Sequence, residues 1–426
     1  MKRSKVFFAV LTAALAVLAL GPVSASFAGE PLRLDDLLRE AEANSPKLAA
    51  MKAKYQAAYE RVSQAGAMPD PMAGIGFENL PVDSFAFDRE QMTGKVVELE
   101  QEFPFFGKRN LRREAARAEA ASIEADYREE ALSLSSEVKT AFYEIYALEK
   151  NVAVLDSSAE VLGSLGKTAN AGYSVGTGAF RDMTKVELEK AMLADRKIAL
   201  VKELRTKRAY LGSLVGRDAA VDGVPEDVAP SAVTLDRGAL AARALALRPA
   251  LLSSDAEIKK GSFMVEIARR DYYPDFTVKA SYMERDTLRG GIHQPDMVSL
   301  MLSANLPIWS KSKLDPAVRE AGFTKKAAED EREAKVKEIY YRIDSLINEI
   351  AQDERTMKLY RDVVVPQAEA DINAGLAGYS SGKAEFMGVL DSVRNLVEYR
   401  SGYYNAAAAR EKALAELSAT VGEDIK

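Results

Sequence analysis

The sequence predicts a mainly α-helical fold with a few β-strands, built as two copies of one unit. Three observations predict it. Landmark residues recur about 205 positions apart, two stretches of about 60 residues have mainly helical composition, and short segments alternate apolar and polar side chains. With 426 residues, the chain is long enough for two or more domain-sized units.

The internal repeat rests on four landmarks that occur in the same order in both halves. The pairs are Asn44-Ser45-Pro46 with Leu247-Arg248-Pro249, Met68-Pro69-Asp70 with Tyr273-Pro274-Asp275, Pro104 with Pro307, and Ala171-Gly172-Tyr173 with Ala377-Gly378-Tyr379. Their offsets are 203, 205, 203 and 206 residues. A repeat of this length indicates a duplicated domain rather than a short-period solenoid. We expect repeat 1 at 29–215, a linker at 216–235 and repeat 2 at 236–426.

The first residues predict export. Lys2, Arg3 and Lys5 precede an apolar run from Val6 to Leu20, and small residues follow it. This pattern is typical of a secretory signal peptide, which we place at 1–28. A transmembrane anchor is the alternative, but the apolar run is short for a membrane span. The chain has no cysteine, so it forms no disulfide and carries no lipid on a cysteine.

Each half is expected to contain a helix, two strands, a long helix, a turn and a shorter helix. A helix of about 60 residues would be about 90 Å long. The expected helices of repeat 1 are Asp35–Gln64, Asn110–Ala169 and Ala179–Val215, and those of repeat 2 are Gly238–Arg270, Pro316–Leu376 and Ala384–Val421.

Apolar residues in both long helices recur at alternating steps of three and four. This heptad pattern predicts side-by-side helix packing. The first seam contains Val138, Ala141, Ile145, Leu148, Val152, Leu155, Ala159 and Leu162, and the second contains Ile339, Ile343, Leu346, Ile350, Met357, Tyr360 and Val364. Asp353 interrupts the second seam. An ordinary helical hairpin or a dimeric coiled coil would show the same pattern.

The predicted strands have one apolar and one polar face. Val97–Phe103 alternates apolar residues with Glu98, Glu100 and Glu102, and Phe276–Tyr282 and Met297–Leu306 also alternate. A fourth segment, Met72–Leu80, is broken by glycines. Such strands suit either a membrane barrel wall or a soluble sheet on a core. Four strands cannot close a barrel alone, so a membrane barrel would have to be shared among protomers. The three acids would then face its hydrated lumen.

Together these features resemble the outer membrane efflux protein family, the TolC-like channels. The most specific matches are the two Gly-Tyr-x-x-Gly turns and the strand-to-helix junctions Phe103–Lys108 and Leu306–Lys311. The resemblance covers essentially the whole mature chain. It implies a TolC-like homotrimer with a shared twelve-stranded barrel in the outer membrane and a helical tunnel across the periplasm. It also implies a periplasmic adaptor and an inner-membrane pump as partners.

The resemblance assigns roles to residues near the turns. Tyr379 and Gly382 match the tip motif, Asp391 matches an aspartate that narrows the closed aperture, and Asp182 matches a partner of Tyr379 in a latch. The family's best-known member has an arginine and a second aspartate where this chain has Ala384 and Gly388, so Arg181 is a candidate substitute in the latch. The tip turns, with Gly172, Gly176, Gly378 and Gly382, are expected to contact the adaptor.

Other interpretations of these residues remain open. The glycines suit tight turns, Tyr379 suits a packed core position, and Asp391 suits a solvated helix face. A soluble periplasmic coiled-coil adaptor or scaffold remains the alternative function. The junction after Pro104 and the absent cysteine resemble the heavy-metal cation efflux branch weakly, and the exported substrate stays undetermined.

We expect no enzymatic activity, cofactor or metal site. His293 is the single histidine, there is no cysteine, and no phosphate-binding loop or nucleophile motif is present. The net charge of −6 argues against a nucleic-acid partner.

Overall fold

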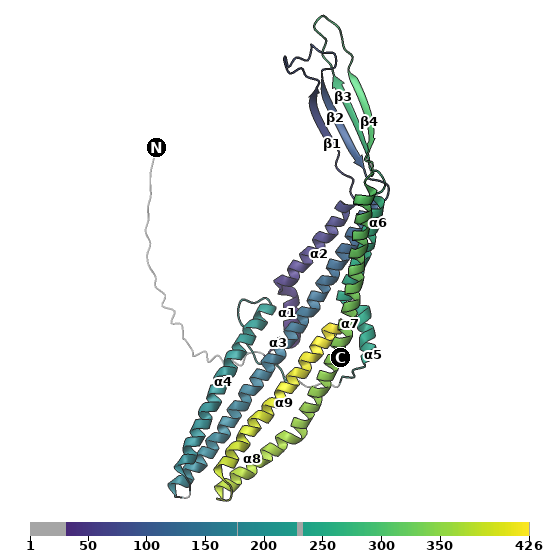
Figure 1. The fold of residues 1–426 in the computed structure, drawn as a ribbon. Helices are drawn as coiled ribbons and strands as arrows, with labels where there is room; N and C mark the ends of the chain where they lie inside the picture. The colour runs from purple at the N-terminus through teal and green to yellow at the C-terminus, as the bar shows by residue number, and fades with distance from the viewer. Residues whose placement is uncertain (1–30, 177, 228–232, 426) are drawn as a thin grey trace, which may run out of the picture.

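The protein is a long bundle of helices with a β-sheet at one end and two helical hairpin tips at the other (Figure 1). The computed structural model describes residues 31–176, 178–227 and 233–425. The predicted signal peptide at 1–28 and part of the predicted linker lie outside the described residues.

The first helix of each half is two helices, which corrects the expectation of one. α1 (Leu34–Asn44) and α2 (Pro46–Ala65) meet at Ser45, and α5 (Arg237–Leu247) and α6 (Pro249–Arg270) meet at Arg248. Ser45 and Arg248 have ψ angles of 116° and 120°. The cause is the proline that follows each of them, because proline excludes the helical conformation from the residue before it.

The long helices of the two halves differ in continuity. α3 (Lys108–Ser174) runs for 67 residues and is followed by α4 (Phe180–Leu214). In the second half a π-helical turn η1 (Ser310–Leu314) leads into α7 (Asp315–Leu359), and a second turn η2 (Tyr360–Val364) separates α7 from α8 (Val365–Ser380). Pro366 at the start of α8 has no N–H for the carbonyl of Asp362, which favours a local departure from α-helical bonding. α9 (Phe386–Val421) completes the chain.

Most residues of the predicted heptad seams lie in buried contacts between helices, whereas Val152, Tyr360 and Val364 are only partly buried. Val138, Ala141, Ile145 and Leu148 of α3 pack in one core cluster with α1 and α4. Ile339, Ile343, Leu346 and Ile350 of α7 pack in another with α5 and α9. A third cluster near the tips joins α3 and α4 to α8 and α9. The helical domain is therefore held together by several cores along its length rather than by one central core.

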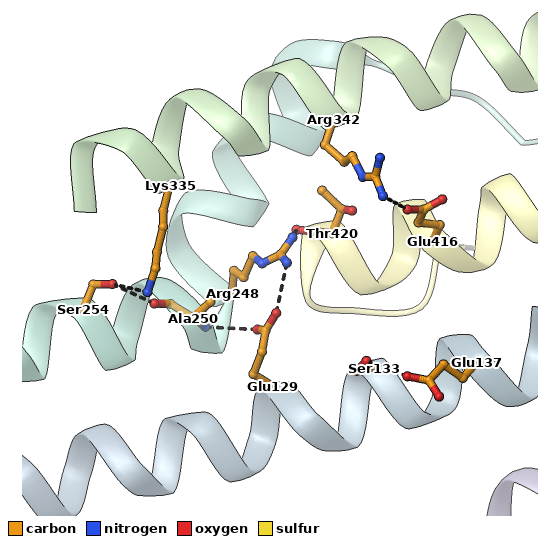
Figure 2. A network of polar contacts seen from close by, with 10 residues as sticks. All are labelled: Glu129, Ser133, Glu137, Arg248, Ala250, Ser254, Lys335, Arg342, Glu416 and Thr420. Atoms are coloured by element: carbon orange, nitrogen blue, oxygen red, sulfur yellow. Dashed lines mark hydrogen bonds and ion pairs between the residues drawn. The ribbon is translucent and has the colours of Figure 1, made fainter. Parts of the chain in front are cut away.

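Polar contacts add to these cores where α3 passes the break between α5 and α6 (Figure 2). Arg248 donates to Glu129 of α3 at 2.9 Å and to the carbonyl of Thr420 at 2.9 Å. Glu129 also accepts from the backbone N–H of Ala250 at 3.0 Å. Because Arg248 stands at the helix break, these bonds fix the second half of the chain against α3.

The four predicted strands are present, and they form one antiparallel sheet in the order β1-β2-β3-β4. They are β1 (Met72–Glu78), β2 (Gly94–Phe103), β3 (Phe276–Glu284) and β4 (Met297–Ala304). The β2–β3 pairing joins the two halves of the chain. No helix among the described residues is long and apolar enough to cross a membrane.

Candidate functional site

One face of the sheet is apolar and open to the surroundings. The exposed fractions reach 88% for Ile75 and 78% for Val298 and Leu300. The strand register places Ile75, Val97, Tyr282 and Val298 in one row across all four strands. A contiguous apolar surface of this kind is unusual on a water-soluble monomer and marks an interaction surface.

The opposite face of the sheet is polar. Glu98, Glu100 and Glu102 all lie on it because they occupy alternate positions of β2. Glu98 forms an ion pair of 2.6 Å with Lys279 of β3. Ser281 and Ser299 occupy the same row as Glu98. The sheet therefore has one apolar and one polar face, with Glu98, Glu100 and Glu102 on the polar one.

Both hairpin tips turn on a glycine with a positive φ angle. Gly176 after α3 has φ 78°, and Gly382 after α8 has φ 72°. Gly172 and Gly378 lie one turn earlier, inside the helices, and each accepts a backbone bond from its turn. A side chain at Gly378 would lie 2.8 Å from the Cβ of Ala384. Gly176 and Gly382 are thus favoured by their positive φ angles, and Gly378 is favoured because any side chain there would collide with Ala384.

Tyr379 and Asp182 meet across the two hairpins. The hydroxyl of Tyr379 on α8 donates to Oδ2 of Asp182 on α4 at 3.2 Å. The ring of Tyr379 packs edge to face on Phe386, with ring centroids 5.6 Å apart. Burial, the negative charge of Asp182 and the hydrogen bond to it raise the pKa of Tyr379. The tyrosine therefore stays protonated and remains a donor.

Asp391 is exposed and forms an ion pair with a neighbouring arginine. Arg394, one turn later on α9, lies 3.1 Å from Asp391 and 2.5 Å from Glu189 of α4. The Glu189 side chain is only 7% exposed. The hydrogen bond to Glu189 is the main cause that raises the pKa of Arg394. This arginine is a second link between α4 and the α8–α9 hairpin, and it offsets part of the charge of Asp391.

Arg181 is exposed, and none of its side-chain contacts within the described part of the chain reaches Tyr379 or Asp391. Arg394 and Glu189 are not among the site residues predicted from the sequence. An arginine three residues after an aspartate is common on exposed helices, so only its partner on α4 distinguishes it.

The strand-to-helix junction holds a buried cation, Lys108, which is also not among the site residues predicted from the sequence. The Lys108 side chain is 3% exposed, and its Nζ lies 2.9 Å from Asp275 and 3.1 Å from Asp271. Asp275 also accepts from the backbone N–H of Phe105 at 2.6 Å. These bonds fasten the start of α3 to the segment that leads into β3. Among the described residues, no group of three histidine or acidic side chains could hold a metal ion.

The comparisons with known proteins agree with this architecture. Residues 37–217 and 240–423 match the model of the family described as outer membrane efflux protein. The chain is 23% identical to the cobalt-zinc-cadmium resistance protein CzcC of Cupriavidus metallidurans, over 94% of this chain and 92% of CzcC.

Two solved structures share the fold. The outer membrane protein VceC of Vibrio cholerae has a TM-score of 0.77 at 17% identity, covering 92% of this chain and 97% of VceC. CusC, which was described for its folding and transmembrane channel formation, has a TM-score of 0.78 at 14% identity, with 92% of both chains covered.

Proposed function

Because the chain belongs to the outer membrane efflux protein family, we propose that it is one protomer of a homotrimeric exit duct in the outer membrane of a Gram-negative bacterium. The duct extends into the periplasm and receives substrate from an inner-membrane pump through a periplasmic adaptor, in a tripartite efflux or type I secretion system. It transports passively and catalyses no reaction.

The sheet is the observation that carries this proposal. Its apolar face, with Ile75 and Leu300 largely exposed, suits contact with outer-membrane lipid, and its acidic face suits a hydrated lumen. Four strands from each of three protomers would close a twelve-stranded barrel. Closure also covers the sheet edges at β1 and β4, whose backbone groups would otherwise be unpaired in lipid.

The hairpin tips are proposed as the periplasmic gate and the adaptor contact. Tyr379, Asp182 and the link from Arg394 to Glu189 join the two hairpins within each protomer and would hold the tips in one arrangement. Asp391 would contribute a ring of three carboxylates at the narrow end, and Arg181 would line the same region. The turns with Gly172, Gly176, Gly378 and Gly382 would meet the adaptor, since they are the ends of the bundle farthest from the sheet (Figure 1).

We further propose heavy-metal cations as the exported substrate class. The similarity to a cobalt-zinc-cadmium resistance protein over nearly the full length of both chains supports this. A passive duct carries what its pump delivers, so specificity need not be encoded in these residues.

Expression of the full chain with its own leader, followed by membrane fractionation and planar-bilayer recording, tests the duct. We expect outer-membrane recovery, heat-modifiable migration on gels and a cation-selective conductance. Recovery wholly in the soluble periplasmic extract would show that the sheet is a water-facing one and that the chain is an adaptor or scaffold.

The variant Asp391→Ala tests the gate in the same recordings. Removing the carboxylate ring should raise the conductance and weaken block by divalent cations applied from the tip side, because fixed negative charge at a constriction binds cations. Glu398→Ala is the matched control, since Glu398 is also an exposed acid of α9 but lies two helical turns away. Equal effects of the two variants would remove Asp391 from the gate.

A further inference from the structure

The buried junction at Lys108 has a counterpart in the second repeat that is left without its partner. The segments Phe103–Lys108 and Leu306–Lys311 correspond at an offset of 203 residues. Lys311 is therefore the counterpart of Lys108, and Ile308 is the counterpart of Phe105. Whereas Lys108 is buried between two carboxylates, Lys311 is exposed.

The partner segment is duplicated as well. Tyr273-Pro274-Asp275 corresponds to Met68-Pro69-Asp70 at an offset of 205 residues, so Asp70 is the counterpart of Asp275. Asp70 is exposed, and no hydrogen bond or ion pair joins its side chain, or that of Lys311, to another residue in the described ranges. A cation and an anion that are both exposed thus have no partner among the described residues of one chain.

The two unpaired groups stand beside the two edges of the sheet. Asp70 precedes β1 and Lys311 follows β4, and these are the outer strands in the order β1-β2-β3-β4. Lys108 and Asp275 stand at the corresponding ends of β2 and β3, which pair with each other. An edge of β4 that paired with the edge of β1 in a second copy would bring Lys311 to Asp70.

The apolar contact at the junction is duplicated in the same way. Phe105 stacks on Tyr273 with ring centroids 4.5 Å apart and planes inclined by 10°. The counterparts are Ile308 and Met68, whose exposed fractions are 68% and 37%. Two exposed apolar side chains at these positions would cover each other in the same contact between protomers.

The offsets also fix a strand register that can be checked against the sheet. Leu99 lies opposite Ala280 in the β2–β3 pair. With the offset of 203 residues, the counterpart of Leu99 is Leu302. With the offset of 205 residues, the counterpart of Ala280 is Ile75. The repeat therefore predicts that Leu302 lies opposite Ile75 where β4 of one copy pairs with β1 of the next. Both side chains lie on the apolar face and are 70% and 88% exposed. A slip of one residue would turn one strand's apolar side chains to the polar face, so the agreement is informative.

We propose that Lys311 of one protomer forms an ion pair with Asp70 of the next, and that β4 pairs with β1 of that neighbour with Leu302 opposite Ile75. This inference rests on the proposed homotrimer and names the contact that closes it. The proposed Lys311–Asp70 pair differs in one respect from the ion pairs of Lys108 within the chain. Gly66 occupies the position that corresponds to Asp271, so Lys311 meets one carboxylate where Lys108 meets two.

Charge reversal tests the ion pair. The purified full-length trimer is compared with Lys311→Glu, Asp70→Lys and the double variant by native mass spectrometry after heating in detergent. We expect each reversal to lower the trimer-to-monomer ratio about tenfold, and the double variant to recover most of that loss, because only paired residues compensate. Lys313→Glu is the matched control, with the same charge change two residues away on η1. A double variant without recovery, or a control as damaging as Lys311→Glu, would overturn the ion pair.

Disulfide cross-linking tests the register, and the native chain has no cysteine to interfere. Ile75→Cys combined with Leu302→Cys should give covalent dimers and trimers on non-reducing gels, because directly opposed Cβ atoms lie within disulfide reach. Ile75→Cys with Val298→Cys is the control, about 13 Å farther along the strand. Cross-linking of the control pair instead would overturn the register.

The outcomes separate the two proposals. A wild-type chain that stays monomeric in outer-membrane extracts overturns the homotrimer and this contact together. A stable wild-type trimer that shows neither charge compensation nor the expected cross-link overturns this contact alone.

Discussion

The long helices of the two repeats occupy matching places but are built differently. α3 is continuous over 67 residues, whereas the second rod is divided by the π-helical turn η2. Leu148 of α3 and Asp353 of α7 stand 205 residues apart at the same seam position. Leu148 is buried in a core cluster, while Oδ2 of Asp353 is buried and has no hydrogen-bond partner in the part of the chain that the structure describes.

In both rods the buried seam falls into two clusters, and α3 passes from one to the other between Leu148 and Val154. Apolar residues around Ile350 form one cluster and those around Met357 form another, with Asp353 between them in the sequence. Arg410 of α9 lies nearby, 2% exposed and paired with Glu354 of α7 at 2.8 Å. The first rod is thus a continuous α-helix, whereas the second has a partly buried aspartate and, a few residues later, a π-helical turn. We therefore expect the second rod to bend at η2 when the α8–α9 tip moves.

The tyrosines at the two hairpin tips also differ in their contacts. Tyr173 and Tyr379 stand 206 residues apart, and each packs on a phenylalanine of the following helix. Tyr173 is 48% exposed, whereas Tyr379 donates to Asp182 on the other hairpin. The tyrosine that bonds across the two hairpins is therefore the one at the end of the more interrupted rod.

The largest effect is expected from replacing Leu148 of the first rod with aspartate, the residue at the matching position of the second rod. Leu148→Asp removes a buried apolar side chain and adds a carboxylate without a partner, so it should destabilise the protein by about 3 kcal/mol. Thermal unfolding followed by circular dichroism in detergent measures this. Leu148→Met is the control and should change stability by less than about 1.5 kcal/mol. If Leu148→Asp lowers the free energy of unfolding by less than about 1 kcal/mol, α3 tolerates a buried carboxylate in its seam as α7 does.

The reverse substitution should stabilise the second rod. Asp353→Leu removes an unsatisfied buried oxygen and joins the two clusters, with an expected gain of about 1 kcal/mol. The same unfolding experiment applies. Gln352→Leu adds the same side chain at the neighbouring exposed position and should have little effect. Destabilisation by Asp353→Leu would mean that Asp353 supports the structure through a contact made in the assembly.

The difference between the tips is tested by removing one hydroxyl at a time. Tyr379→Phe should weaken the tie to Asp182 by about 1 kcal/mol and raise the open probability of the channel in planar bilayers. Tyr173→Phe makes the same chemical change at the matching position and should leave the recordings unchanged. The assignment of the latch fails if the two variants behave alike.

The smallest expected effect is a pH dependence of protein stability that is caused by titration of Asp353. Burial and the nearby charge of Glu349, opposed by Lys412, raise the pKa of Asp353 in the folded protein. The folded state then binds a proton more tightly than the unfolded state, whose aspartate pKa is about 3.9. Stability is therefore lost as pH rises from about 3.9 through the folded pKa.

Comparison of the wild type with Asp353→Leu isolates this effect from other titrating groups. The stability advantage of the variant should grow as pH rises through that window and then level off. We expect less than about 1 kcal/mol, because the group is partly exposed and solvent screens it. An advantage that is constant with pH would indicate that the carboxyl titrates normally.

Much of the architecture could be predicted from the sequence because it depends on periodicity. The heptads of α3 and α7 and the alternation in β2, β3 and β4 are repeated many times, so single exceptions do not obscure them. The breaks at Pro46 and Pro249 were visible in the sequence, yet the helical pattern on both sides masked them. The proximity of Tyr379 and Asp182 was expected only through the resemblance to a family.

The sequence by itself determined the repeat, the long helices, the strand pairs and the two-faced character of the sheet. Only the tertiary structure decided which charges are buried and which tips are tied: Lys108 against Asp275, Arg394 against Glu189, and Tyr379 against Asp182. The reason is physical. Periodicity is a property of neighbouring residues, whereas burial and pairing of a charge depend on a partner more than 160 positions away, which only the folded chain brings into contact.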